Sequence, residues 1–164
     1  DKYDKVYFTR QTISMGNHAD GFLPGDIEAK ISPFMKGMYD NLEVLKSIHT
    51  NHPNIIDGYQ KNGELIIEPL GYIRGRTLPR IFFIIDEAQN LTPKEVKTIV
   101  TRAGEGTKVI FLGDTKQIDH PYLDQRSNGL SYLIQKFRGQ ECYSHVHLIN
   151  SERSELAELA SELL

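Results

Sequence analysis

The sequence predicts an α/β fold of three layers, α/β/α, in which a largely parallel sheet is covered by helices on both sides. Short runs rich in Val, Ile and Phe alternate with segments of helical periodicity along the chain. The run 81–85 is apolar at every position, which is typical of a strand buried on both faces of a parallel sheet. With 164 residues, 39% of them hydrophobic, the chain can bury one core, so we expect a single domain over 1–164.

The expected strands are short and rich in β-branched or aromatic residues. They cover 6–9, 65–67, 81–85, 109–112 and 146–149. A long Gly-rich loop over 14–25 follows the first strand, and its length indicates a functional role. Further loops are expected over 50–63 and 71–78, because Pro and Gly interrupt both segments.

The expected helices are bounded by recognisable capping residues. Ser32 as N-cap with Pro33 at the first helical position predicts a helix that ends near His49. Thr92 and Glu95 form a capping box, and the helix they open is expected to close at Gly104. Apolar stripes predict two more helices, over 130–137 and 154–164.

Charge and cysteine content exclude several classes of protein. The formal net charge of −3 argues against a uniformly basic surface that coats nucleic acid, although a local basic patch remains compatible with it. The lone Cys142 cannot form an internal disulfide and is interpreted as a packing residue. No signal peptide or long apolar run is present, so we expect a cytoplasmic protein without a membrane partner.

Two histidine pairs have a spacing compatible with metal binding. His49 with His52, and His145 with His147, have spacings that place each pair on one face of a helix or strand. Neither pair has a nearby third ligand, so surface or packing roles are expected.

Two adjacent carboxylates follow the most apolar predicted strand. Asp86 and Glu87 stand at its carboxyl end, where open α/β sheets bind their ligands. Hydrolysis of a phosphoanhydride needs one carboxylate to hold Mg²⁺, usually through water, and another to orient and deprotonate the attacking water. Asp86 suits the first task and Glu87 the second. A solvated acidic pair at a strand end is the alternative interpretation.

A second polar cluster, 113–117, follows the next strand. Gly113 would let the backbone approach a ligand, and the Gln117 amide can donate to a phosphate oxygen and accept from water. Gln117 is therefore a candidate phosphate sensor, with a solvated turn residue as the alternative. Arg74 and Arg76 present two guanidinium groups suited to phosphates of nucleotide or RNA, although solvent exposure explains them nearly as well.

The two polar clusters together resemble a known family. Residues 86–90 (DEAQN) and 113–119 (GDTKQID) look like motifs II and III of the PhoH family, phosphate-starvation-inducible ATPases related to superfamily 1 helicases. Further similar segments occur in the family's order, at 9–10, 21–26, 39–42, 74–77 and 152–154. The stretch 119–130 is more similar to the branch whose members carry an N-terminal PIN ribonuclease domain.

The resemblance implies a RecA-like P-loop NTPase fold with ATP and Mg²⁺ as cofactors. It implies Asp86 for Mg²⁺, Glu87 for water activation and Gln117 for sensing the terminal phosphate. Other candidate nucleotide contacts are Gln89, Gly113, Asp114, Arg74 and Arg76. Arg153 is implied as an arginine finger, and if it acts between subunits the protein forms a homo-oligomeric ring; a surface arginine beside Glu152 or Glu155 is the alternative. By the same resemblance Arg10 could contact a single-stranded backbone.

The sequence lacks the phosphate-binding motif Gly-x-x-x-x-Gly-Lys-Ser/Thr. In the resembled family this Walker A loop lies upstream of the matching segment, so we expect a truncated ATPase domain that binds ATP poorly and does not turn it over alone. The full-length protein is expected to be an RNA-dependent ATPase or helicase. The alternatives are a nucleotide-gated assembly or RNA-binding module without strand unwinding, and an α/β domain without activity.

Overall fold

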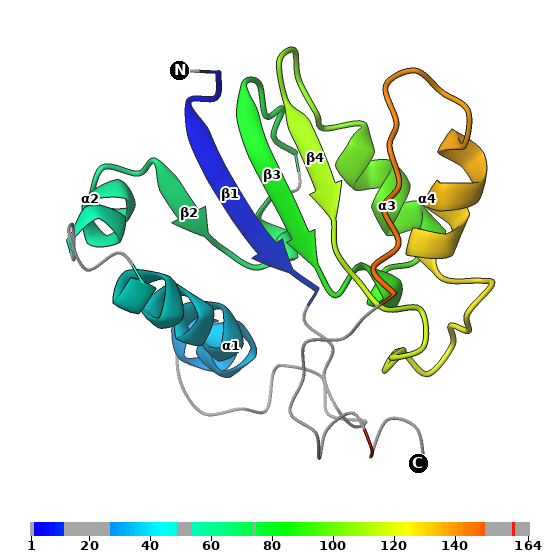
Figure 1. The fold of residues 1–164 in the computed structure, drawn as a ribbon, viewed down its shortest axis with the longest axis horizontal. Helices are drawn as coiled ribbons and strands as arrows, with labels where there is room; N and C mark the ends of the chain where they lie inside the picture. Colours follow the sequence, from blue (N-terminus) through cyan, green and yellow to red (C-terminus); the bar gives the residue numbers. More distant parts are fainter. Residues whose placement is uncertain (1, 12–26, 49–53, 74, 150–158, 160–164) are drawn as a thin grey trace. The chain divides into compact units, whose positions relative to one another are not determined.

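The structure is a computed structural model that describes residues 2–11, 27–48, 54–73, 75–149 and 159, with side chains in 27–34 outside the description. The chain divides into two compact units, Asp1–Leu133 and Ile134–Leu164. The first unit contains a four-stranded sheet (Figure 1). The single domain expected from composition stays a prediction.

The sheet is parallel throughout. Its strands are β1 (Lys5–Arg10), β2 (Leu65–Ile67), β3 (Ile81–Asp86) and β4 (Lys108–Phe111), in the order β2-β1-β3-β4. β1 and β3 pair over their whole length, from Lys5 opposite Ile81 to Arg10 opposite Asp86. The predicted parallel α/β fold is therefore confirmed, and four of the five predicted strands are present.

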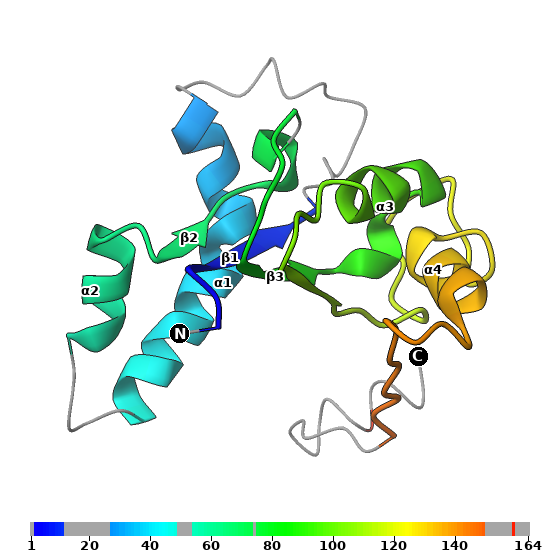
Figure 2. The same cartoon turned by 90° about the horizontal axis from the view of Figure 1, so that it is seen from above.

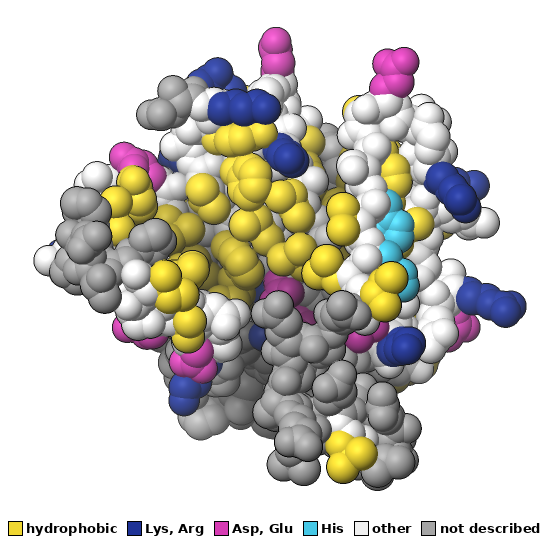
Figure 3. Space-filling view, in the orientation of Figure 1, with side chains coloured by type: hydrophobic (Ala, Val, Ile, Leu, Met, Phe, Trp, Pro, Cys, Tyr) yellow, Lys and Arg dark blue, Asp and Glu magenta, His cyan; other side chains and the backbone are white. Residues whose placement is uncertain are grey.

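The two faces of the sheet are packed to different degrees. On one face the side chains of Tyr7, Phe83 and Ile85 are buried almost completely. Strand residues alternate between faces, so the opposite face carries Val6 and its neighbours, and Val6 is 37% exposed. Figure 3 shows hydrophobic side chains gathered at the surface over the strands. Among the described residues, helices thus cover the second face incompletely.

The first helix begins earlier than predicted. α1 spans Ile27–Ile48, so Ser32 is not its N-cap and Pro33 lies inside it. Proline disrupts the turn before it but permits helix on both sides, and Glu28, Ala29 and Lys30 all favour helix. The capping preference of Ser32 and Pro33 therefore predicted the wrong first residue for this helix. The loop expected over 14–25 lies outside the described residues.

A short helix occupies part of the predicted loop 50–63. α2 spans Ile55–Lys61 and lies beside β2 in both views (Figures 1 and 2). The loop prediction is wrong there, because tertiary contacts outweigh the low helix propensity of Gly58. Ile56 is buried, and Lys46 Nζ on α1 lies 2.8 Å from the Asp57 carboxylate. The predicted loop 71–78 begins within a 3-10 turn, η2 (Leu70–Ile73).

The helix after β3 confirms the predicted capping box. In α3 (Pro93–Val100), the Glu95 amide donates to Thr92 Oγ1 at 3.2 Å, and the Thr92 amide donates to Glu95 Oε2 at 2.9 Å. The helix ends at Val100 and not at Gly104. The chain leaves the helix because Gly104 donates its amide to the Leu78 carbonyl at 3.0 Å, a long-range bond invisible to local capping rules.

Among the predictions for residues 129–149, one is confirmed and two are wrong. α4 (Gly129–Phe137) forms as expected. The predicted strand 146–149 is absent: the segment is irregular, with Val146, Leu148 and Ile149 74%, 82% and 88% exposed. A strand needs a ladder partner, and the described residues provide none here. Cys142 is exposed and not a packing residue. The predicted helix 154–164 and the pair His49 and His52 fall outside the described residues except for position 159.

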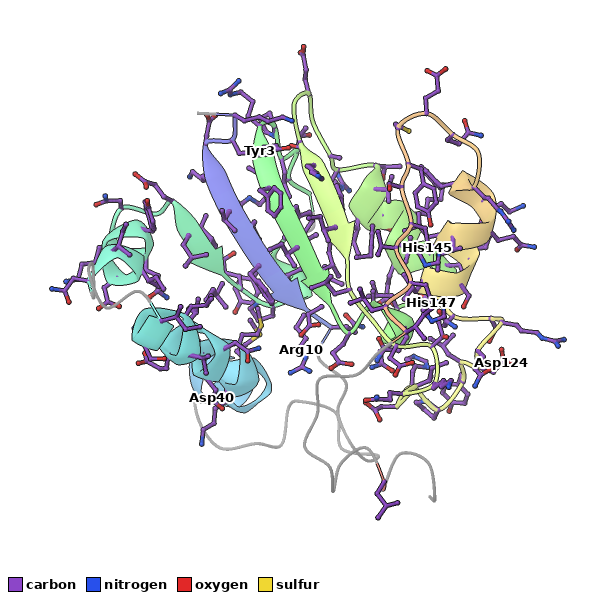
Figure 4. All side chains as sticks on the ribbon, viewed as in Figure 1. Tyr3, Arg10, Asp40, Asp124, His145 and His147 are labelled. Atoms are coloured by element: carbon purple, nitrogen blue, oxygen red, sulfur yellow. The ribbon has the colours of Figure 1, made fainter. Side chains whose placement is uncertain are left out.

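His145 and His147 lie on this irregular segment and are both exposed (Figure 4). They are surface residues, as expected. In the described ranges, no helix has the length and apolar character needed to cross a membrane.

We expect Gly129→Ala to destabilise the chain by about 1–3 kcal/mol, because overpacking a tight contact forces the backbone to shift. A Cβ at this position would lie 2.5 Å from Val96 Cγ2, 2.7 Å from the Leu91 carbonyl oxygen and 2.8 Å from that of Thr92. Urea denaturation measures the loss.

The matched control is Gly58→Ala in α2, where an added Cβ meets nothing within 4 Å. Alanine favours helix, so this variant should gain about 0.5–1 kcal/mol. Equal effects of the two substitutions would contradict the packing assigned to Gly129.

Candidate functional site

The carboxyl ends of β1, β3 and β4 meet at one edge of the sheet, because the three strands are parallel neighbours. Backbone hydrogen bonds join the ends of β3 and β4: the Leu112 amide donates to the Ile85 carbonyl at 2.8 Å, and the Ala88 amide to the Leu112 carbonyl at 2.9 Å. The two polar clusters predicted from sequence, 86–90 and 113–117, are thus brought together.

Glu87 has an unusual backbone conformation. Its φ of 54° and ψ of 39° place it in the left-handed region, immediately before the 3-10 turn η3 (Ala88–Asn90). This conformation costs roughly 1–2 kcal/mol for a residue with a side chain. Such strain persists where the surrounding structure holds it, and it is common at functional sites. In this conformation the Glu87 carboxylate accepts hydrogen bonds from Arg10 and Gln89.

Gln89 connects the two clusters. Its side chain is 1% exposed, and its Nε2 donates to Glu87 Oε2 at 2.6 Å and to the Gln117 carbonyl at 2.8 Å. Its Oε1 accepts from the Asp114 amide at 3.2 Å. These three hydrogen bonds go to Glu87 and to the loop after β4, and the role of Gln89 as a nucleotide contact stays a prediction. Burial makes it a connector that fixes the position of Glu87 relative to the loop after β4.

Gly113 is needed for this connection. A Cβ at position 113 would lie 2.5 Å from Gln89 Oε1, 3.1 Å from the Gln89 amide nitrogen and 3.1 Å from Leu130 Cδ2. The absence of a side chain therefore admits Gln89. The structure supplies this packing reason for the glycine in addition to the close ligand approach predicted from sequence.

The loop after Gly113 is exposed and internally bonded. Gln117 Nε2 donates to Asp114 Oδ2 at 3.0 Å, and the Lys116 amide donates to Asp114 Oδ1 at 2.9 Å. Both Asp114 and Gln117 are exposed to solvent. Their side chains are therefore accessible to a ligand while the backbone beneath them is held by Gln89.

Asn90 is a buried residue of the site that sequence reasoning missed. It is 2% exposed, and its Oδ1 accepts from the amides of Asp119 at 2.8 Å and His120 at 3.2 Å. It fixes the far end of the loop after β4 in the same way that Gln89 fixes the near end. Its place directly after Gln89 in a turn that follows a buried strand was the available signal.

Arg10 adds a positive charge to the carboxylate pair. The guanidinium donates from Nη2 to Glu87 Oε1, and its Nε lies 3.6 Å from Asp86 Oδ2. Figure 4 shows Arg10 at the carboxyl end of β1. Sequence reasoning placed Arg10 only as a nucleic-acid contact. Its pairing depends on the β1–β3 register, which local patterns do not specify.

The sequence matches one family of known proteins over nearly its whole length. The family model described as PhoH-like protein matches residues 1–163. The chain belongs to the PhoH family.

Individual PhoH relatives cover nearly the whole chain. "Protein PhoH2" of Bacillus subtilis (strain 168) is 47% identical over 163 residues, which are 99% of this chain and 36% of that protein. "Protein PhoH2" of Mycolicibacterium smegmatis is 36% identical over 98% of this chain and 35% of its own length. A "PhoH-like protein" of B. subtilis is 38% identical over 88% of this chain and 43% of its length. The chain thus spans about a third of the length of the first two.

Burial raises the pKa of Asp86 in this PhoH chain. Removal of the carboxylate from water is the largest cause, and the neighbouring charge of Glu87 acts in the same direction. A hydrogen bond from the Glu87 backbone and the charge of Arg10 oppose the shift. Ionisation of the Asp86 carboxyl therefore costs more free energy in the folded chain than in water.

The other arginines predicted for the PhoH nucleotide site are not brought to the carboxylates by the described contacts. Arg76 lies 3.9 Å from the Glu68 carboxylate and 5.9 Å from the ring centroid of Tyr7, whose hydroxyl donates to Glu68. Arg74 and Arg153 lie outside the described residues. In the described ranges, no group of three or more His, Cys, Asp or Glu is arranged to hold a metal ion.

We expect Gln89→Ala to lower the free energy of unfolding by about 1–3 kcal/mol, because it leaves buried polar partners without hydrogen bonds. Hydrogen exchange at the Asp114 amide should accelerate, since that amide loses its acceptor. Gln135→Ala, an exposed position on α4, serves as control and should change stability by less than about 0.5 kcal/mol. Unchanged exchange at Asp114 would argue against the connecting role of Gln89.

Asp86→Asn should make the chain more stable at pH 7. The raised pKa means that the folded state binds the Asp86 proton more tightly than the unfolded state, so ionisation weakens folding. This cost is present above the folded pKa and disappears as the pH falls below the unfolded pKa. The stability difference between variant and wild type should therefore shrink on acidification. Thermal unfolding between pH 7 and pH 3 measures this difference. A wild type that is more stable than Asp86→Asn at pH 7 would contradict the predicted direction.

Proposed function

We propose that this chain supplies the hydrolytic face of an ATPase domain in a longer PhoH-family protein that acts on single-stranded RNA. The observation that carries the proposal is the carboxylate pair Asp86 and Glu87, held at a shared strand edge and tied to the loop after β4 through the buried Gln89. Family membership supports this choice of chemistry over that of a solvated acidic pair.

Asp86 fits the task of holding Mg²⁺. Its side chain is 27% exposed, so one carboxylate at the sheet edge can meet a hydrated ion. Mg²⁺ typically keeps several waters and takes only one or two carboxylates together with substrate phosphates. The bound ion would neutralise charge on the phosphates. Asp86 contributes the negative charge that attracts it, and its unfavourable burial would then be offset.

Glu87 is proposed to act as the general base. A carboxylate can accept a proton from the attacking water and orient that water toward the terminal phosphate. The left-handed backbone and the hydrogen bond from Gln89 restrict where this carboxylate can lie. That restriction supports a positioned base, because a freely rotating side chain would have to be ordered during the reaction.

The exposed loop after β4 is proposed to sense the terminal phosphate. The Gln117 amide can donate to a phosphate oxygen, and it lies on a backbone held by Gln89. Asp114 Oδ2 accepts a hydrogen bond from the Gln117 side chain and so helps to position it. Arg74 and Arg76 remain proposed phosphate contacts, and Arg153 a proposed arginine finger within a ring of subunits, on the family resemblance.

We propose that the loop that binds the ATP phosphates lies in another part of the longer protein. The sequence contains no Gly-x-x-x-x-Gly-Lys-Ser/Thr, whose backbone amides would cradle the phosphates. The chain spans 36% of the length of its B. subtilis PhoH2 relative, so most of such a protein lies outside the matched region. A fused PIN domain and a cytoplasmic location are further proposals from the resemblance.

For the full-length protein, Glu87→Gln should lower ATP turnover by about 10²–10⁴-fold, because the amide cannot accept the proton of the attacking water. ATP affinity should be retained, since Gln keeps the size of the side chain. Steady-state turnover and equilibrium binding of a fluorescent ATP analogue measure the two quantities.

Glu64→Gln, an exposed position before β2, is the matched control and should leave turnover unchanged. The chain 1–164 alone should show no Mg²⁺-dependent turnover. Turnover by the isolated chain would refute the need for an external phosphate-binding loop. Failure of single-stranded RNA to stimulate the full-length protein, together with no RNA retention at moderate salt, would favour a nucleotide-gated assembly instead.

A further inference from the structure

Arg10 is placed to act on the proposed catalytic base from a neighbouring strand. It is the last residue of β1 and lies opposite Asp86, the last residue of β3, in the parallel register. The Gln11 side chain, one residue further, donates from Nε2 to Glu95 Oε1 at 3.2 Å. This bond ties the chain after β1 to the first turn of α3, so the position of Arg10 is fixed on both sides.

The guanidinium and the Gln89 amide together occupy both oxygens of the Glu87 carboxylate. Arg10 Nη2 donates to Oε1, and Gln89 Nε2 donates to Oε2 at 2.6 Å. With both carboxylate oxygens accepting from protein donors, an attacking water has to compete with the guanidinium for its place on Oε1. In this arrangement Glu87 is positioned but restrained.

The restraint can be exchanged for another anion. The side chains of Arg10 and Glu87 are 27% and 31% exposed, so a ligand can reach the guanidinium from solvent. Ion pairs at this degree of exposure contribute little to stability. A guanidinium has five donors, and its fork geometry fits phosphate as well as carboxylate oxygens. A phosphate that takes Arg10 would therefore leave Glu87 with the Gln89 contact alone.

We propose that Arg10 is a positioning residue that restrains Glu87, and that single-stranded RNA releases the restraint by drawing the guanidinium onto a backbone phosphate. This inference rests on the proposed ATPase function and adds a link between the RNA site and the hydrolytic site. The link is short: one side chain pairs with the base in one state and with RNA in the other. RNA binding and ATP hydrolysis are coupled through that exchange.

The test uses the full-length protein and a matched pair of substitutions. Arg10→Gln removes the charge beside Glu87. Arg80→Gln is the control, because Arg80 joins the opposite ends of the same two strands through an exposed pair with Asp4, at 3.0 Å. Turnover is measured with and without a single-stranded RNA oligonucleotide, over a range of ATP concentrations.

Arg10→Gln should raise turnover without RNA by about two- to five-fold, the range expected from loss of one partly exposed ion pair. Stimulation by RNA should fall to near one-fold, while the KM for ATP should stay unchanged, because the proposed role of Arg10 is to act on the base Glu87. Arg10→Lys keeps the charge without the planar fork. Its basal turnover and its stimulation by RNA should lie between those of the wild type and Arg10→Gln. Arg80→Gln should behave as wild type.

RNA affinity provides a second measurement that a merely structural role would not change. The slope of log affinity against log salt should decrease by about 0.7 in Arg10→Gln, which corresponds to one lost phosphate contact on a single strand. Arg80→Gln should keep the wild-type slope. Arg10→Lys should keep most of it, and it carries the test if Arg10→Gln does not fold.

Three results would overturn the inference and leave the proposed ATPase function standing. They are wild-type turnover that RNA does not stimulate, unchanged basal turnover and stimulation in Arg10→Gln, and a loss of turnover in Arg10→Gln with and without RNA. Absence of ATP hydrolysis by the wild-type full-length protein would instead refute the proposed function, and the inference with it.

Discussion

The parallel pairing of β1 with β3 determines which side chains meet at the site. The register that places Lys5 opposite Ile81 also places Arg10 opposite Asp86, so a cation ends beside two carboxylates. A shift of one residue would turn the Arg10 side chain to the other face of the sheet. Burial of Tyr7 and its neighbours on one face opposes such a shift, because it would expose them. Packing in the middle of the sheet thus sets the charges at its edge.

The site combines features that each reduce stability. Asp86 is ionised against the effect of burial, and Glu87 has a left-handed backbone. Glu87 is held by a buried polar network in which Gln89 and Asn90 bond the loop after β4, and Asp86 lies beside the Arg10 guanidinium. A buried amide with all its partners present rigidifies its surroundings, whereas the loss of one partner is costly. The buried Gln89 amide therefore helps to keep Glu87 in its strained conformation.

Predictions from sequence succeeded where the signal was local or strongly apolar. The run 81–85, the Thr92 capping box and α4 were all found where expected. Local rules failed at the start of α1, at α2 and at the segment 146–149, where contacts with distant residues or their absence decide the structure. Arg10 could not be assigned to the carboxylates from sequence, because 76 positions separate it from Asp86 in the chain and only the sheet brings them together.

By itself the sequence determined the fold class, the PhoH family and the acidic strand end at Asp86 and Glu87, because apolar runs and short motifs are properties of neighbouring residues. Only the tertiary structure decided the strand order, the connecting role of Gln89 and the pairing of Arg10 with Glu87. These features depend on the register of the sheet and on the side-chain packing at its edge. Both result from contacts between residues far apart in the chain, which no local pattern encodes.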